Sequence, residues 1–175
     1  MYLINLLEAE HSRSQMQTIV SYIGTSQKRF DDLIKIFLSG QYRLAQRAAW
    51  PISNCAAAHP QLINKHFVTL IKMMKDENQH PAVRRNVLRI LDNLALIPEK
   101  YHGVIMDACF IYISNPFETI ACQSFALGIL DKLSDTYPEI KPELALIIED
   151  KLPHATAAFK SRAMKILKKK RSNSI

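Results

Sequence analysis

The sequence predicts an all-α protein whose helices pack as antiparallel pairs, and three observations carry this prediction. Apolar residues recur at spacings of three and four along almost the whole 175-residue chain, which is the period of an amphipathic helix. Only four glycines occur, and no segment shows the clear two-residue alternation of a half-buried strand. The chain also resembles itself when it is shifted so that Leu44 falls on Val83, and such self-similarity is typical of repeat architectures.

The internal repeat aligns apolar residues in three successive segments, and we call the offset from Leu44 to Val83 the repeat period. The matching positions are Leu44, Val83 and Cys122; Ala48, Val87 and Ala126; Ile52, Leu91 and Leu130; and Cys55, Leu94 and Leu133. The same shift superimposes Pro60, Glu99 and Pro138, each of which opens the next apolar segment. Proline or an acidic residue suits the first turn of a helix, so each repeat is predicted to contain two helices.

The predicted helices follow directly from this alignment. The first helices of the repeats are expected near 41–58, 81–96 and 117–136, and the second helices near 61–75, 99–114 and 139–151. The segments between them are short and polar, so consecutive helices should be antiparallel neighbours. Helices near 12–23 and 26–38, separated by Gly24, precede the repeats, and "AAFKSRAMKILKKKR" opens like a further first helix.

These elements predict a single domain that spans residues 1–175. We expect N-terminal capping helices within 1–40, repeats at 41–79, 80–118 and 119–157, and a basic capping helix at 158–171. Terminal units of such a stack are expected to be atypical, because each must present a polar outer face.

One segment resembles a known family. In "HPAVRRNVLRIL" the family's Pro-x-Val-Arg-x-x-(Ala/Val)-Leu pattern is matched by Pro81, Val83, Arg84, Val87 and Leu88. Together with the repeat period, this resembles the HEAT family of α-solenoids, the HEAT/ARM-like α-α superhelices, over about residues 41–171. Pro51 inside a first helix agrees with the bent first helices of that family. The resemblance implies a non-catalytic scaffold that presents a curved helical surface to a protein or peptide partner.

The net charge of +7 is confined to the end of the chain. Residues 160–175 hold seven basic residues and no acid, whereas residues 1–159 hold sixteen of each sign. A duplex-binding groove usually spreads its cations along one face, and this chain does not. No apolar run is long enough for a membrane span and no signal peptide is evident, so we expect a cytoplasmic protein. The cysteines, Cys55, Cys109 and Cys122, show no C-x-x-C pairing and are expected to be buried.

Five arginines of two adjacent first helices form the main candidate site. They are Arg43, Arg47, Arg84, Arg85 and Arg89. On the helix near 81–96 the buried stripe is expected to comprise Val83, Val87, Ile90, Leu91 and Leu94, which leaves the arginines mostly off it. The arginines are interpreted either as a solvated face or as a patch that binds phosphate or acidic groups.

Trp50, the only tryptophan, suggests an alternative function. Trp50 and Asn54 stand four residues apart, and Arg85 or Arg89 follows one repeat later. This resembles HEAT-like bacterial DNA glycosylases that excise alkylated bases, which carry Trp-x-x-x-Asp on one helix and an arginine about one repeat later. Asn54 replaces the aspartate, and Gly128 replaces a further aromatic residue. The resemblance therefore implies nucleic-acid binding without catalytic activity.

The basic C-terminal segment adds Lys160, Arg162 and Lys165 to the candidate binding residues. Its cations either complement a helix dipole or attract nucleic acid or an acidic partner. Glu8 and His11 have the spacing of one metal-ligating pair, but a di-metal bundle needs two such pairs. No metal-ligand cluster, glycine-rich phosphate loop or nucleophile motif is recognisable. We therefore expect no metal, cofactor or enzymatic activity; the oligomeric state stays open.

Overall fold

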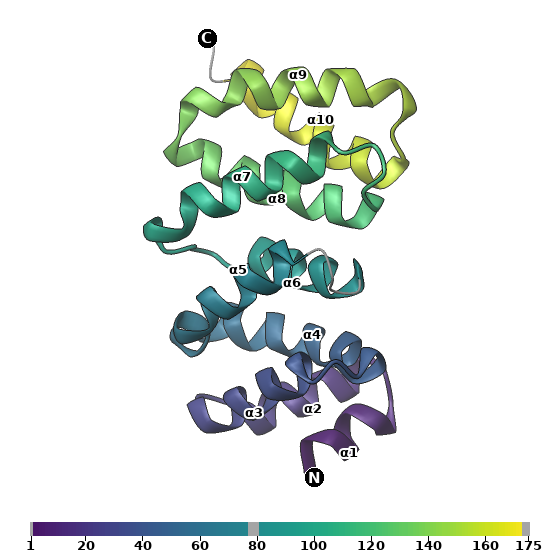
Figure 1. Cartoon of the computed structure of the whole chain (residues 1–175), viewed down its shortest axis with the longest axis vertical. Helices are drawn as coiled ribbons and strands as arrows, with labels where there is room; N and C mark the ends of the chain where they lie inside the picture. Colours follow the sequence, from purple (N-terminus) through teal and green to yellow (C-terminus); the bar gives the residue numbers. More distant parts are fainter. Residues whose placement is uncertain (1, 77–80, 173–175) are drawn as a thin grey trace. The chain divides into compact units, whose positions relative to one another are not determined.

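The computed structural model describes residues 2–76 and 81–172, except for the side chains of 158 and 169–172, and every regular element in these ranges is helical (Figure 1). The prediction of an all-α protein is thereby confirmed. The chain divides into two compact units, Met1–Ile97 and Pro98–Ile175. The single-domain assignment and the repeat boundaries at 41, 80 and 119 stay predictions.

The first unit extends from α1 to α6. Its elements are α1 (Tyr2–Ala9), α2 (Arg13–Ile23), α3 (Gln27–Leu38), α4 (Tyr42–Ala58), the 3-10 helix η1 (Pro60–His66), α5 (Phe67–Lys75) and α6 (Pro81–Asn93). The second unit comprises η2 (Glu99–Tyr101), α7 (His102–Ser114), α8 (Ile120–Thr136), η3 (Pro138–Ile140), α9 (Lys141–Lys151), η4 (Leu152–His154) and α10 (Ala157–Ser172).

The helices lie close to the predicted ranges, and the differences have local causes. Gly24 adopts a φ of 50° at the end of α2, a conformation that glycine allows without steric cost. Thr119 caps α8 by accepting a hydrogen bond from the backbone N–H of Cys122, so α8 begins at Ile120 rather than at 117. Each second helix opens with a 3-10 helix before its α-helix. Helix α1 was not predicted.

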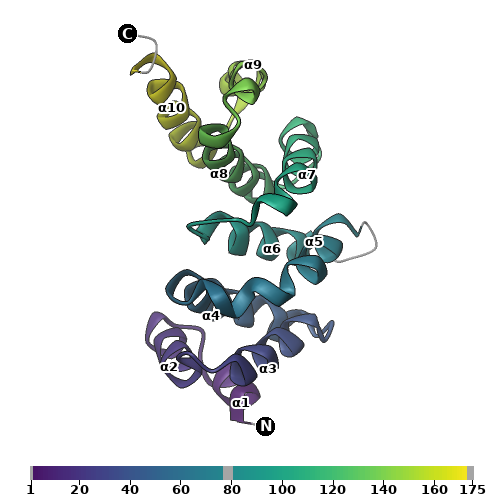
Figure 2. The ribbon, with the colours of Figure 1, turned by 90° about the vertical axis from the view of Figure 1, so that its left-hand side faces the viewer.

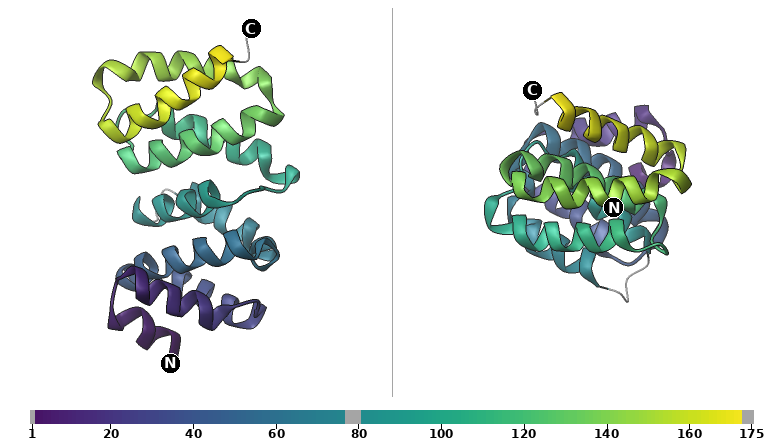
Figure 3. Two further views of the ribbon diagram at one scale, coloured as in Figure 1. Left: turned by 180° about the vertical axis from the view of Figure 1, so that it is seen from behind. Right: turned by 90° about the horizontal axis from the view of Figure 1, so that it is seen from above.

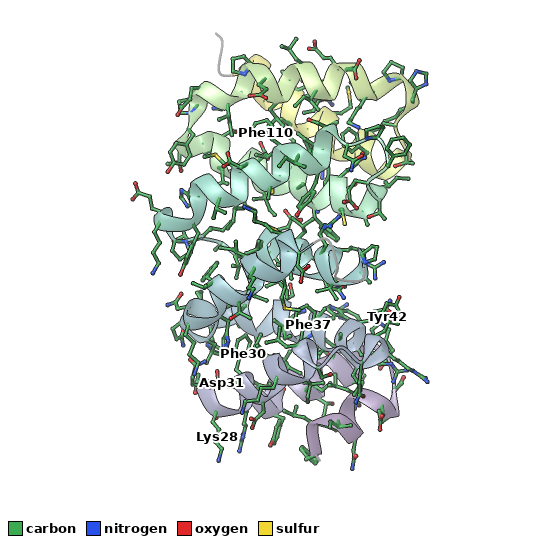
Figure 4. All side chains as sticks on the ribbon, in the orientation of Figure 1. Lys28, Phe30, Asp31, Phe37, Tyr42 and Phe110 are labelled. Carbon is green, nitrogen blue, oxygen red and sulfur yellow. The ribbon has the colours of Figure 1, made fainter. Side chains whose placement is uncertain are left out.

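The core of the first unit surrounds α4, which packs against α2, α3 and α6. Figure 4 labels Phe30 and Phe37, the two aromatic residues by which α3 contributes to this core, and both are almost completely buried. Ile52 on α4 and Leu91 on α6 are fully buried. Apart from Val83, the repeat-equivalent apolar positions are buried, as predicted.

In the second unit, α8 lies between α7 and α10 (Figure 2). Figure 3 shows from behind that α10 runs along α8. Cys122, Ala126 and Leu130 of α8 are fully buried, and α10 inserts Phe159 and Ala163. Ala126 and Leu130 are the repeat equivalents of buried residues on both α4 and α6, and they have the same structural role.

The predicted buried stripe of α6 is wrong at Val83, which is only half-buried. Ala82, Asn86 and Leu88 are buried in addition to the other predicted residues. The cause is that α6 packs against both α4 and α5, so its buried face is wider than a single stripe. The wider face also leaves Arg84, Arg85 and Arg89 half-buried rather than fully exposed.

Polar contacts join helices that stand one repeat apart. The Nη1 atom of Arg47 donates to the carbonyl oxygens of Leu7 and Glu8 at 2.7 and 2.9 Å. The amide of Asn93 donates to the hydroxyl of buried Ser53 at 2.6 Å. These contacts span 39 or 40 residues of sequence, so the period seen in the sequence sets polar as well as apolar packing.

Asp31 of α3, labelled in Figure 4, connects α3 to the η1 segment. It accepts hydrogen bonds from Lys65 at 2.6 Å and from Gln27 at 2.9 Å, and it makes a 2.8 Å contact with His66. Partial burial alone raises the pKa of the Asp31 carboxyl. The hydrogen bonds from Lys65, Gln27 and His66 and the charge of Lys65 outweigh burial and lower the pKa from 3.8 to about 2.

We expect Asp31→Asn to lower the free energy of unfolding at pH 7 by about 2 kcal/mol, because the ionised form of Asp31 is favoured by folding. A carboxyl whose pKa is depressed in the folded state stabilises above its unfolded pKa, and this stabilisation is lost as the pH falls toward 2. The difference between variant and wild type should therefore shrink from pH 5 to pH 2. Urea unfolding at several pH values measures it.

Asp32→Asn is the matched control, because Asp32 pairs with Lys35 of the same helix and its side chain is 46% exposed. An exposed pair of this kind contributes at most about 0.5 kcal/mol. Equal losses in the two variants would contradict the assigned role of Asp31.

All three cysteines are free and buried, as predicted. Burial raises the pKa of the Cys55 thiol to about 12, so almost none of it is thiolate near neutral pH. No helix in the described ranges is long and apolar enough to cross a membrane.

Candidate functional site

The structure separates the five predicted arginines into groups with different surroundings. Arg47 donates to the C-terminal carbonyls of α1, and the Nε of Arg84 donates to the carbonyl of Met74 at 3.3 Å. Arg43 is exposed in the first turn of α4, where it lines a pocket of about 360 Å³ with Glu8 and other residues. Arg47 and Arg84 therefore join helices, whereas Arg43 lies at a rim.

Arg85 and Arg89 differ from these arginines. They stand four residues apart on α6, both are half-buried, and no hydrogen bond or ion pair connects either of them to another residue of the described ranges. Burial lowers the pKa of the Arg89 guanidinium, and the neighbouring charge of Arg85 lowers it further. Two like charges thus share a partly desolvated position without a described acidic residue to neutralise them.

Trp50 lies between Arg89 and His11. The guanidinium carbon of Arg89 is 5.7 Å from the centre of the Trp50 ring, within range of a cation–π interaction. The His11 ring meets the Trp50 ring edge-on at a centroid distance of 5.9 Å. We call His11, Trp50, Arg85 and Arg89 the Trp50 surface; all four residues belong to the first unit.

His11 was not predicted as part of this surface, although the sequence contained the necessary signal. His11 precedes Trp50 by one repeat period, and Trp50 precedes Arg89 by one more, so the three residues occupy equivalent positions of the repeat. Shifting the alignment back by one period would have identified His11. The contacts of Trp50 with His11 and Arg89 thus join residues that stand one repeat period apart.

Asn54 is engaged by its own helix. Its side-chain amide donates to the backbone carbonyl of Trp50 at 3.0 Å. Position 54 thus supplies an amide rather than a carboxylate, and this amide is already hydrogen-bonded.

A small pocket lies beside Trp50. It is lined by Glu10, His11, Arg47 and other residues.

The basic candidates of α10 also differ from one another. The Nη1 atom of Arg162 donates to the carbonyl oxygen of Ser124 at 2.9 Å, and its guanidinium carbon lies 5.6 Å from the centre of the Phe125 ring. Arg162 therefore attaches α10 to α8. Lys160 and Lys165 are exposed and are the residues of this group available to solvent.

The Glu8 and His11 pair does not lie on one helical face. Glu8 belongs to the last turn of α1, whereas His11 lies between α1 and α2. Within the described ranges, no group of three or more His, Cys, Asp or Glu side chains is placed to hold a metal ion.

Comparisons with known proteins agree with the repeat architecture. The family described as "HEAT repeat domain" matches residues 3–170, which is nearly the whole chain. No curated protein and no solved structure shows significant similarity. Helix pairs whose buried positions recur with the repeat period are the structural counterpart of this match. The chain therefore belongs to the HEAT repeat family.

Proposed function

We propose that this protein is a non-catalytic binding scaffold that holds a protein or peptide partner on the Trp50 surface. The observation that carries the proposal is the pair Arg85 and Arg89 of α6, which is half-buried without a described acidic partner, with Arg89 over the Trp50 ring. Tryptophan and arginine are among the residues most enriched in energetic hot spots of protein interfaces. A partner that covers this surface would supply the hydrogen-bond acceptors that the guanidinium groups of Arg85 and Arg89 lack.

The surroundings of Trp50 support binding rather than catalysis. Asn54 stands where the resembling glycosylases have an aspartate, and its amide is hydrogen-bonded to the Trp50 carbonyl. An amide cannot provide the negative charge of a carboxylate or act as a general base at neutral pH.

Nucleic-acid binding is the less favoured function, because few cations are free to contact phosphates. Arg47, Arg84 and Arg162 donate to backbone carbonyls. A duplex is normally bound by several cations that follow its backbone. The Trp50 surface offers two, which suits a discrete acidic or polar group better than a continuous polyanion.

A capture experiment tests the proposal. Immobilised full-length protein is incubated with extract of its source cells, and the retained proteins are compared with those of Trp50→Ala. Phe117→Ala is the control, because Phe117 is an aromatic residue of the second unit with 93% of its surface exposed. We expect a specific protein to be retained by wild type and by Phe117→Ala but lost from Trp50→Ala. Equal retention by all three would contradict the proposal.

A DNA titration distinguishes the nucleic-acid function. Labelled single-stranded and duplex DNA are titrated at two salt concentrations into wild type, Arg85→Gln and the double substitution Lys160→Gln, Lys165→Gln. Tight, salt-dependent binding that is lost in Arg85→Gln but kept in the lysine variant would favour the nucleic-acid function and overturn the proposed one. We expect weak binding that depends mainly on Lys160 and Lys165.

A further inference from the structure

We infer that the Trp50 surface recognises an acidic peptide segment, whose carboxylates pair with Arg85 and Arg89 beside the indole ring. This inference rests on the proposed function and adds the chemistry of the partner to it. It follows from three features of the surface: the acceptors that the arginines lack, the geometry of their donors, and the small number of free cations.

The first feature is the contrast with the other half-buried arginines. Arg47, Arg84 and Arg162 each donate to a backbone carbonyl, with distances from 2.7 to 3.3 Å. Arg85 and Arg89 have no described acceptor, although both are half-buried. A guanidinium that is partly removed from water without an acceptor is unfavourable. Among the half-buried arginines of the described ranges, Arg85 and Arg89 are thus the two without an acceptor, and Arg89 lies over the Trp50 ring.

The second feature is the geometry of donation. A guanidinium above an aromatic ring keeps its N–H groups free at the edge, where they match the two oxygens of a carboxylate. Arg89 is placed in this way over Trp50. Residues four apart on a helix are neighbours on its surface, so Arg85 and Arg89 can be reached by two adjacent acidic side chains. A carboxylate there would also offset the repulsion between the two arginines.

The third feature is that the positive charge is local. Outside its last sixteen residues the chain balances sixteen basic against sixteen acidic residues, and Arg47 and Arg84 of the same region are engaged with carbonyls. The charge pattern therefore complements a short acidic segment of a protein.

Trp50 makes a direct titration possible, because it is the only tryptophan and its fluorescence reports on this surface alone. The full chain is titrated at low salt with a synthetic peptide in which Glu and Asp flank a leucine, and with the same peptide carrying Gln and Asn instead. We expect saturable quenching or enhancement with the acidic peptide only. Arg85→Gln and Arg89→Gln should each weaken binding roughly tenfold or more, as truncation of one partner of a charge pair does.

Arg43→Gln is the matched control, because Arg43 is an exposed arginine of α4 outside the Trp50 surface. Its affinity for the acidic peptide should equal that of wild type within about twofold, since an exposed rim charge contributes little. Circular dichroism of all variants establishes that each is folded, so that a lost signal reports on binding.

Four outcomes would overturn the inference. These are no binding of the acidic peptide, equal binding of the neutral peptide, equal weakening by Arg43→Gln, or tighter binding of inorganic phosphate or an oligonucleotide through Arg85 and Arg89. If the acidic peptide fails while cellular protein is still captured in a Trp50-dependent manner, the acidic chemistry is wrong and the scaffold function stands. If both fail, the proposed function is wrong as well.

Discussion

Leu130→Ala is expected to lower the free energy of unfolding by about 3 kcal/mol, which is typical of a leucine truncated in a packed core. Leu130 is fully buried in α8, and α8 packs against both α7 and α10. The substitution removes apolar surface and leaves a cavity between helices that depend on each other for burial. Urea unfolding followed by far-UV circular dichroism measures the loss. Tryptophan fluorescence is less suitable, because Trp50 lies in the other unit.

Leu146→Ala provides the control within the same unit. Leu146 lies on α9, and 68% of its surface is exposed. Its truncation should change the free energy of unfolding by less than about 0.5 kcal/mol. If Leu130→Ala and Leu146→Ala have similar effects, the buried position assigned to α8 is wrong.

Arg47→Gln is expected to lower the free energy that holds α1 in place by about 2 kcal/mol, because hydrogen bonds from a charged donor contribute more than neutral ones. Arg47 satisfies the carbonyl oxygens of Leu7 and Glu8, which would otherwise be unpaired at the end of a helix of only eight residues. Hydrogen exchange of the amides of α1 should accelerate roughly thirtyfold.

Arg43→Gln serves as the comparison, because Arg43 is exposed one turn earlier on the same helix. It should leave the exchange of α1 unchanged. If Arg43→Gln accelerates the exchange of α1 as much as Arg47→Gln does, α1 responds to the overall charge of α4 and not to the hydrogen bonds of Arg47.

The helix pairs could be predicted from the sequence because core burial repeats with a fixed period. Ile52, Leu91 and Leu130 follow one another at the repeat period and are all fully buried. Helix α1 could not be predicted in this way. It is too short to be stable alone. It is held by contacts with α2 and α4 and by the hydrogen bonds from Arg47 to its carbonyl oxygens. The local sequence of α1 indicates none of these contacts.

The candidate site was predictable in its residue types but not in their roles. Arg47, Arg84 and Arg85 look alike in the sequence, since each stands off the main apolar positions of an amphipathic helix. Their roles depend on which backbone carbonyls the fold brings within reach, and these belong to other helices. His11 was within reach of the sequence, because it lies one period before Trp50.

Arg47 stabilises the fold, whereas Arg85 is assigned to partner binding. The unfolding free energies of Arg47→Gln and Arg85→Gln test this assignment most directly. Both substitutions remove one charge from a half-buried arginine of the first unit. Arg47→Gln should lose about 2 kcal/mol, because it breaks two hydrogen bonds of the fold. Arg85→Gln should leave stability unchanged or raise it slightly, since it relieves the repulsion with Arg89. A loss in Arg85→Gln as large as that in Arg47→Gln would contradict a binding role for Arg85.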